Sequence, residues 1–305
     1  HNVLVLDKPQ WKISDGTWQD ENEILRIDRE IRKYLGIPIR GKAMMQPWAR
    51  KESQKTKSTN VCLKYRFFIE TIPTGETCLA IEKPELYRIS INGHQINSDL
   101  ESGWWVDRSL RLLRFDPSIL CVEENQIVLE TLYDAEHPGF EIIYVLGNFG
   151  VKMIDNNPAI VGNVQQLSTG DWTQQGLLFY SGNVTYLHQI QIEVKENQKI
   201  FVNIPDYKAA AVRILVDGKS AGIIAWQPNC IDITEFVNDG KTHTLGIELF
   251  GHRRNSHGPF HFYQKYPQWT GPYQFVAEND EFFEGYQVVP CGLVREPEII
   301  RYVVE

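Results

Sequence analysis

The densest group of chemically versatile side chains lies in the segment GHRRNSHGPFHFY, residues 251–263. Three histidines, two arginines and an asparagine stand there beside aromatic rings. His252, His257 and His261 lie in a stretch whose Gly-Pro pair indicates a loop rather than one face of a helix. Zinc ligands have to converge and to be held by supporting partners. The spacing therefore argues against a metal site, and we predict none.

The same segment lacks the groups that hydrolyse a glycosidic bond. That reaction uses a pair of carboxylic acids, and residues 251–263 contain neither Asp nor Glu. Carboxylates elsewhere in the chain have no spacing that selects them. Two interpretations stay open. In the first, Arg254 and Asn255 fix a long loop through side-chain bonds to the backbone, with Pro259 and Phe260 packed beneath. In the second, the loop faces a carbohydrate or a further domain.

The residue types in and around this loop suit sugar recognition. Sugars present C–H faces that stack on aromatic rings, and hydroxyl groups that bind Arg, Asn and His. We predict the following carbohydrate-binding residues: Trp104, Arg253, Arg254, Asn255, His257, His261, Trp269 and Tyr273.

The composition is typical of a soluble globular chain and argues against polyanionic partners. The net charge of the 305 residues is −8, which argues against nucleic acid or an anionic membrane as a partner. We find no apolar run near the roughly eighteen residues of a membrane helix and no signal-peptide leader. The chain begins with His1 on a strand-like run, so we expect a piece of a longer protein, with cytoplasmic and extracytoplasmic locations both open. Five scattered cysteines without a CxxC pair indicate neither a disulfide framework nor a zinc cluster.

One helix is expected, over residues 20–36. Asp20 is the expected cap, Glu23 completes a capping box, and apolar residues recur at helical spacing until Gly36 and Pro38. The polar, basic segment 50–60 that follows is typical of a linker or exposed loop.

From residue 61 onward the sequence predicts antiparallel β-sandwiches, because short β-branched and aromatic runs alternate with turn signals. The pattern occurs twice, with corresponding residues about 120 positions apart. Tyr65 corresponds to Tyr186, Asn92-Gly93 to Asp217-Gly218, and Trp105 to Trp226. We therefore predict a mainly β chain of tandem sandwiches. Residues 1–60 would form a connecting segment, 61–160 the first sandwich and 161–305 the second.

The repeat also predicts where the tryptophans point. Trp105 and Trp226 hold equivalent places, which indicates a shared core position. Neighbouring residues of a strand point to opposite faces. Trp104 is therefore expected on the outside, where it is the better ligand candidate.

Several stretches carry a resemblance to a known family. FYSGNVTYLHQIQIEV, followed by VRILVDGKSAGIIAWQPNCIDITEFVNDGKTHTLGIELF, resembles the sugar-binding jelly roll that accompanies glycoside hydrolases of families 2 and 106, the latter α-L-rhamnosidase-like. RRNSHGPFH, NVLVLDKPQWKISDGTW and IIYVLGNFGV resemble other stretches of large family-106-like proteins. The resemblance implies galactose-binding-like jelly rolls beside a separate catalytic barrel. No alternation of strands and helices predicts such a barrel in this chain.

We therefore expect a non-catalytic, carbohydrate-binding or scaffold portion of a larger glycoside hydrolase, with carbohydrate and the barrel of the same polypeptide as partners. Two alternatives stay open: a stand-alone interaction or adhesion module, and an all-β enzyme such as a lyase or deacylase. No cofactor is predicted. Galactose-binding-like sandwiches often hold a structural calcium, which is left open because no DxDxDG-type run indicates one.

Overall fold

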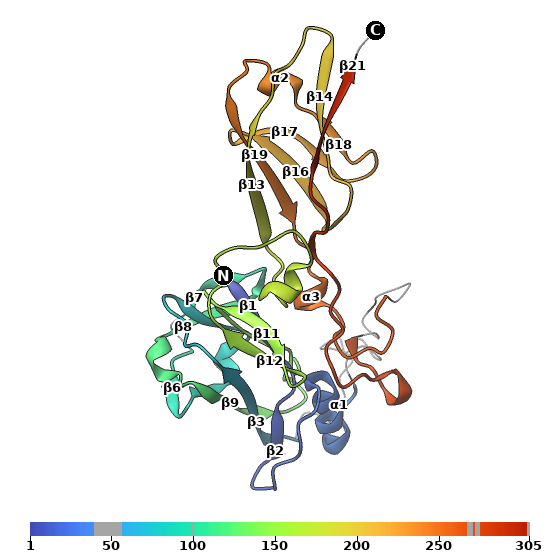
Figure 1. Cartoon of the computed structure of the whole chain (residues 1–305). Helices are drawn as coiled ribbons and strands as arrows, with labels where there is room; N and C mark the ends of the chain where they lie inside the picture. The colour runs from blue at the N-terminus through green and yellow to red at the C-terminus, as the bar shows by residue number, and fades with distance from the viewer. Residues whose placement is uncertain (40–56, 99–100, 267–270, 272–274, 304–305) are drawn as a thin grey trace. The chain divides into compact units, whose positions relative to one another are not determined.

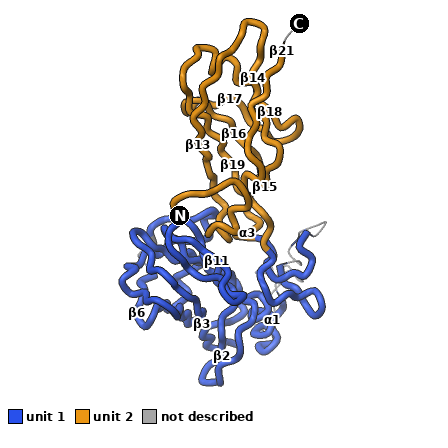
Figure 2. The backbone as a smooth tube through the Cα atoms, viewed as in Figure 1, with its two compact units in different colours: residues 1–164, 258–287 blue, residues 165–257, 288–305 orange. Residues whose placement is uncertain are grey.

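The computed structural model describes residues 1–39, 57–98, 101–266, 271 and 275–303. They form two compact units (Figure 2): unit 1 comprises residues 1–164 and 258–287, and unit 2 comprises residues 165–257 and 288–305. The described chain is mainly β, with antiparallel sheets and three helices, which confirms the predicted fold class. In the described residues no helix is long and apolar enough to cross a membrane.

Unit 1 contains two sheets (Figure 1). One has the strand order β1-β10-β4-β8-β7, and the other has the order β11-β12-β3-β9-β5-β6, with β2 also paired to β3. The strands are β1 Asn2–Leu6, β2 Gln10–Ile13, β3 Thr59–Ile69, β4 Thr77–Glu82, β5 Arg88–Ile91, β6 His94–Ile96, β7 Glu101–Trp105, β8 Asp107–Phe115, β9 Glu123–Tyr133, β10 Ile143–Gly147, β11 Gly150–Ile154 and β12 Asn157–Val161. The long strands β3 and β9 alternate buried and more exposed residues, so one face of their sheet covers the core.

Unit 2 is smaller and has the strand orders β13-β19-β16-β17, β18-β14-β21 and β15-β20. Its strands are β13 Asn183–Gln191, β14 Gln198–Asn203, β15 Tyr207–Lys208, β16 Ala211–Val216, β17 Lys219–Ile224, β18 Cys230–Asp232, β19 Thr242–Phe250, β20 Gly292–Leu293 and β21 Glu298–Val303. Two short helices, α2 Thr234–Val237 and α3 Arg254–His257, also belong to this unit.

The division into units differs from the one expected from sequence. The first 60 residues contribute β1, β2 and a helix to unit 1, and β1 pairs with β10 along its whole length. Residues 258–287 belong to unit 1 although they lie in the sequence between β19 and β20, which both belong to unit 2. Both differences come from pairing between distant segments, which local sequence patterns do not reveal. Most of segment 50–60 lies outside the described residues, and its last two residues begin β3.

The predicted helix exists but begins later. Helix α1 spans Ile24–Leu35, and its apolar residues of helical spacing are buried. Glu23, rather than Asp20, is the N-cap: its two carboxylate oxygens accept from the backbone N–H groups of Leu25 and Arg26, each at 3.0 Å. Gly36 ends the helix at a φ of 68°, as a left-handed C-cap requires.

The two units share a strand order. The order β3-β9-β5-β6 of unit 1 corresponds, in chain sequence, to β13-β19-β16-β17 of unit 2, and β10-β4-β8 corresponds to β21-β14-β18. The two predicted hairpin turns are also alike, since Asn92-Gly93 and Asp217-Gly218 have φ angles of 49° and 82° and of 50° and 77°. That the two units superpose stays a prediction.

The exposed position predicted for Trp104 agrees with the structure, whereas the buried position predicted for Trp226 does not. Trp104 is 54% exposed, as expected, and Trp105 is half-buried against Tyr144, with ring centroids 5.0 Å apart. The prediction of a core position for Trp226 is wrong, because its side chain is 81% exposed. Trp226 lies in the loop between β17 and β18 rather than on a strand, so strand alternation does not apply to it.

Candidate functional site

The predicted loop 251–263 is divided between the units, and its first half is tied to unit 2. Asn255 is fully buried and exchanges two hydrogen bonds with the backbone of Val289, of 2.7 and 2.8 Å. Arg253 is exposed and donates to Ser181 Oγ at 2.9 Å. The amide of Asn255 therefore fixes the loop to a neighbouring segment, as the first interpretation of this loop expects.

The histidines of the loop have unlike environments. Burial lowers the pKa of His257 to about 4, and burial also lowers the pKa of His252. Both rings are therefore neutral near pH 7. No group of three or more His, Cys, Asp or Glu side chains among the described residues is arranged to hold a metal ion.

His261 belongs to unit 1 and lies among acceptors. Its Nε2 is 3.0 Å from Asp7 Oδ2, and its Nδ1 is 3.1 Å and 2.9 Å from the carbonyl oxygens of Phe283 and Gly285. Because both ring nitrogens face acceptors, this arrangement favours the doubly protonated imidazolium form of the ring. Burial is the largest single influence and opposes that charge, but Asp7, Glu23 and the Phe283 carbonyl together raise the pKa of His261. Tyr286 donates to the other Asp7 oxygen at 2.7 Å.

Glu23 is a second buried carboxyl near this pair. Burial raises the pKa of Glu23 to about 8, with a further increase from the Asp7 charge, although its bonds from α1 oppose the shift. Both of its oxygens are occupied by the helix N-terminus. Glu23 therefore stabilises α1 and is not available to a ligand.

Of the remaining predicted site residues, Trp104 lies exposed on β7 and Arg254 lies half-buried at the start of α3. Trp269 and Tyr273 lie outside the described residues. A carbohydrate-binding role of the predicted set stays a prediction.

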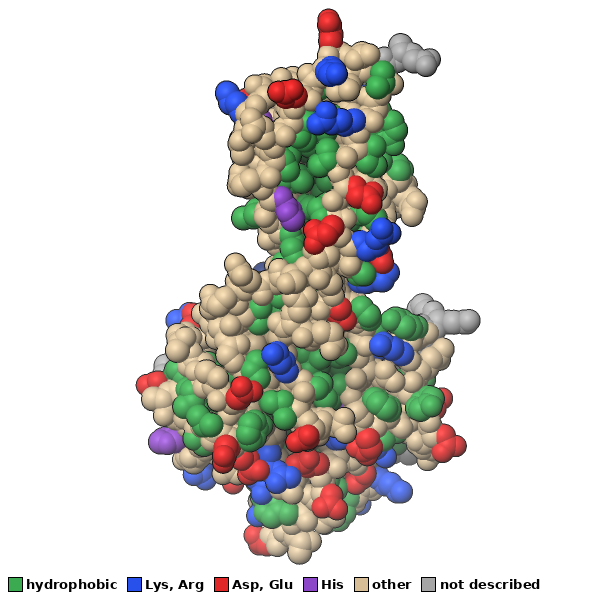
Figure 3. All heavy atoms as spheres, viewed as in Figure 1, with side chains coloured by type: hydrophobic (Ala, Val, Ile, Leu, Met, Phe, Trp, Pro, Cys, Tyr) green, Lys and Arg blue, Asp and Glu red, His purple; other side chains and the backbone are tan. Residues whose placement is uncertain are grey.

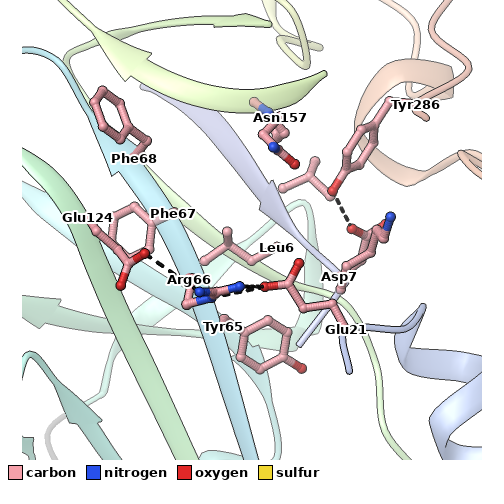
Figure 4. A pocket seen from close by; sticks show the side chains of 13 residues that line it. Leu6, Asp7, Glu21, Tyr65, Arg66, Phe67, Phe68, Glu124, Asn157 and Tyr286 are labelled. Atoms are coloured by element: carbon pink, nitrogen blue, oxygen red, sulfur yellow. Dashed lines mark hydrogen bonds and ion pairs between the residues drawn. The ribbon is translucent and has the colours of Figure 1, made fainter. Parts of the chain in front are cut away.

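A cavity of about 270 Å³ lies within unit 1, beside the Asp7–Tyr286 pair (Figure 4). It is lined by Val5, Leu6, Asp7, Lys8, Glu21, Tyr65, Arg66, Phe67, Phe68, Glu124, Asn157, Pro158 and Tyr286. Charged groups, an amide and four aromatic rings thus surround a space of the size that suits one small ligand or one sugar unit.

The cavity exists because two short strands share one side of β3. Strand β2 pairs with β3 up to Lys64, whereas β12 pairs with β3 from Phe68 onward. In the register of the described strands, residues 65–67 of β3 have a partner only in β9, on the other side. A gap three residues long is left in the sheet, and the cavity lies at this gap.

The charged side chains around the cavity are paired with one another. Arg66 donates from Nε and Nη2 to Glu21 at 3.0 and 2.7 Å and lies 3.7 Å from Glu124, as Figure 4 shows. Lys8 forms an ion pair of 2.8 Å with Glu284. Acidic and basic side chains are likewise interspersed over the face of unit 1 seen in Figure 3. The cavity therefore presents hydrogen-bonding groups without a strong net field of either sign.

One polar group of the lining lacks a partner among the described residues. The hydroxyl of Tyr65 is buried, with 1% of the residue exposed, and forms no hydrogen bond there. Leaving a buried hydroxyl unpaired is costly.

The sequence did not predict this cavity. Asp7 and Arg66 each interrupt an apolar pattern, in VLVLD and KYRFF, and that signal was available. The gap itself depends on where β2 and β12 stop pairing with β3, which no single segment encodes.

Comparison with known proteins gives distant likenesses only. No family model matches the sequence, and no curated protein matches it. Among solved structures, the chain is similar to a rhamnosidase from Novosphingobium sp. PP1Y (12% identity, TM-score 0.31) and to a β-D-mannosidase from Dictyoglomus thermophilum (12% identity, TM-score 0.33). These matches cover 83% and 82% of this chain but 23% and 31% of those enzymes. An anti-sigma factor domain-containing protein from Clostridium clariflavum is also similar (10% identity, TM-score 0.24), with 81% of this chain and 90% of that one covered. The structural neighbours of this all-β chain thus include glycoside hydrolases without being confined to them.

Proposed function

We propose that this chain is a carbohydrate-binding or scaffold portion of a larger glycoside hydrolase, whose catalytic barrel is a separate domain. The observation that carries the proposal is the cavity at the gap in the sheet of unit 1. It combines carboxylates, a guanidinium and an amide with the rings of Phe67, Phe68 and Tyr286. This is the mixture with which proteins bind sugar hydroxyls and C–H faces.

The bonding of the carboxylates supports a non-catalytic role. Glycoside hydrolysis needs one carboxyl that donates a proton and a second that acts as base or nucleophile. Asp7 already accepts from Tyr286 and His261, and Glu21 and Glu124 both face Arg66. The three carboxylates of the lining are thus held in structural pairs. The resemblance of loop 253–261 to family-106-like proteins supports the link with a glycoside hydrolase.

Sugar contacts outside the cavity are part of the same proposal. Trp104 in unit 1 and Arg253 in unit 2 are exposed, and each is suited to contact a glycan within its own unit. Asn255 and His261 would act indirectly, since their polar atoms hold neighbouring segments.

The experiment is a glycan-array screen of the purified chain, followed by titration calorimetry on the hits. Arg66→Ala should weaken binding at least about tenfold, because it removes charge-assisted hydrogen bonds at the cavity. Arg88→Ala is the matched control, since Arg88 pairs with Glu130 on the same sheet outside the cavity. Aryl glycosides should not be turned over. Binding to a protein partner without any glycan hit would favour the adhesion-module alternative, and turnover abolished by one Asp or Glu substitution would refute the non-catalytic role.

A further inference from the structure

Strand β13 forms one edge of the four-stranded sheet of unit 2 (Figure 1). It is nine residues long and pairs along its whole length with β19. In the described part of the chain, no strand pairs with its other side. An edge strand presents a row of unpaired N–H and C=O groups to any strand that fits it.

The odd-numbered residues of β13 turn their backbone groups toward this open side. Asp217 N donates to the carbonyl of Thr244 at 2.9 Å, in the register of β16 with β19, so the Thr244 backbone faces β16. This direction alternates along a strand. The Leu245 backbone therefore faces β13, where its partner is His188. Leu187, next to His188, consequently directs its N–H and C=O away from β19.

One end of the edge is already closed. The carbonyl of Asn183, an odd-numbered residue, accepts from the hydroxyl of Tyr180 at 3.0 Å. The central odd-numbered residues are Thr185, Leu187 and Gln189, whose side chains are exposed, and the exposed fraction of Leu187 is 68%. These three residues are the part of the edge that a further strand would pair with.

The sequence of β13 lacks the features that keep edge strands apart. Proteins protect such edges with charged side chains, with proline or with irregular pairing. The sequence of β13, NVTYLHQIQ, contains neither Lys, Arg, Asp or Glu nor Pro. At the opposite edge of the sheet, β17 carries Lys219, and the register of its pairing with β16 shifts between Ile214 and Leu215.

The strand that fits this edge best is β13 itself. If Leu187 pairs with its own counterpart in an antiparallel second copy, Thr185 pairs with Gln189 on either side. The backbone groups of all three residues face the open side, so each pair can exchange two hydrogen bonds. The two exposed leucines then lie directly opposite each other, between neutral pairs, and an apolar cross-strand pair of this kind is favourable.

Charges beyond the ends of the strand are complementary in the same register. Ser181, two residues before β13, would lie opposite Glu193 of the second copy, two residues after it. Ser181 Oγ accepts from Arg253 Nη1 at 2.9 Å, and Glu193 is exposed. The two-fold symmetry of the pair would therefore bring a carboxylate toward a guanidinium at both ends.

We propose that two copies of this chain associate through β13, so that their four-stranded sheets become one continuous sheet. The proposal is independent of carbohydrate binding and concerns unit 2 alone. Both copies use the same edge, so the contact closes on itself and association stops at the dimer.

The first experiment measures mass by sedimentation and light scattering over a roughly hundredfold range of concentration. The mass should rise toward twice the 35.3 kDa of one chain. Leu187→Lys should raise the dissociation constant of the dimer at least about tenfold, because it places two like charges opposite each other. Ile223→Lys is the matched control, since Ile223 is 58% exposed on β17. It should leave the dissociation constant unchanged, with folding of both variants checked by circular dichroism.

Three results would overturn the proposal. They are a chain that stays monomeric over the whole range, a dimer that the two variants affect equally, and a monomer that binds an extended peptide at this edge instead of a second copy.

The second experiment tests the register by disulfide cross-linking, with the exposed Cys121 replaced by Ser. The Cα atoms of a hydrogen-bonded antiparallel pair lie about 5.5 Å apart, within the range that a disulfide spans. Leu187→Cys should therefore give a covalent dimer on a non-reducing gel. Thr185→Cys should not, because its counterpart lies roughly 13 Å further along the paired strands. Failure of Leu187→Cys to cross-link, or equal cross-linking by Thr185→Cys, would contradict the proposed pairing.

Discussion

In both units a side chain of a hairpin turn forms hydrogen bonds with a neighbouring strand, but the chemical groups in the two networks differ. In unit 1, the hairpin residue Asn92 accepts from Gln126 N at 2.9 Å, and its amide contacts Asn125 Oδ1 at 2.7 Å. In unit 2, the hairpin residue Asp217 accepts from Thr244 N at 2.8 Å and contacts His243 Nδ1 at 2.7 Å. The geometry corresponds, but the first network consists of neutral amides and the second of ionisable groups.

The difference shows that strand order and turn geometry do not fix the electrostatics of a site. His243 lies between Asp217 and Asp239, with its Nε2 2.8 Å from the latter. Hydrogen bonds that the ring donates to these two carboxylates raise the pKa of His243. The backbone N–H of Lys241 and then His243 lower the pKa of Asp239 to about 2. The unit 1 network has no titrating member of this kind, and the two units should therefore respond differently to pH.

The largest expected effect is that of Asn125→Ala in unit 1. Asn125 is buried and its amide bonds with Asn92 and with the backbone of Cys121 and Glu123. Truncation leaves several of these groups unpaired, and the free energy of unfolding should fall by about 2–4 kcal/mol. Urea denaturation at pH 5.5 and 8.5 should give the same loss at both values. A loss that changes with pH would break the contrast with unit 2.

A smaller change in the free energy of unfolding is expected when the hydroxyl of a buried tyrosine in unit 1 is removed. Its size should depend on whether that hydroxyl forms a hydrogen bond. Tyr133 is buried and donates to Asp28 at 2.5 Å, whereas the Tyr65 hydroxyl has no partner among the described residues. Tyr133→Phe should cost about 1–3 kcal/mol, because it removes a bond to a charged group. Tyr65→Phe should leave the free energy of unfolding unchanged or raise it, because it removes a buried hydroxyl that forms no hydrogen bond with the described residues. Thermal melts of both variants measure this, and equal losses would mean that Tyr65 has a structural bond.

The raised pKa of His243 should make the local stability of unit 2 depend on pH. A histidine with a raised pKa stabilises the fold fully below its unfolded value of about 6.5, and that stabilisation is lost as the pH rises through the folded value. Protection of the Thr244 amide against hydrogen exchange should therefore fall as the pH rises above about 6.5, after correction for intrinsic exchange rates. The Gln126 amide of unit 1 is the internal control. A local measurement is needed because the pKa of His261 in unit 1 is raised too.

A matched variant tests the cause of that pH dependence. His243→Gln keeps a polar side chain without a titrating ring, and it should flatten the pH profile of Thr244. Its stability should be lower than that of the parent at pH 6 and closer to it at pH 9. A profile that stays steep in His243→Gln would assign the dependence to another group.

Local patterns predicted what is local in this molecule. The alternation of β3 and β9, the apolar face of α1 and the left-handed turns at Asn92 and Asp217 were all readable from short windows. The Asp7–His261 pair was not, since 254 residues separate its members. The cavity was hidden for the same reason, because it depends on where two separate strands stop pairing with β3.

The smallest expected effect concerns the tryptophans that the sequence placed in equivalent core positions. Trp226 is 81% exposed and Trp104 is 54% exposed, whereas Trp105 packs edge-on against Tyr144. Trp226→Ala should change the free energy of unfolding by less than about 0.5 kcal/mol, and Trp104→Ala by less than about 1 kcal/mol, as exposed substitutions do.

Trp105→Ala is the reference for these two variants, because half-burial and the aromatic contact should make it the costliest, at about 1–3 kcal/mol. Thermal melts of the three variants check the order. A loss for Trp226→Ala as large as that for Trp105→Ala would restore the equivalence of the two residues and contradict the exposed position of Trp226. If the order holds, Trp104 and Trp226 are the pair with like environments. Each is then free to contact a ligand at little expense in stability, and a glycan titration of Trp104→Ala and Trp226→Ala measures whether either of them does.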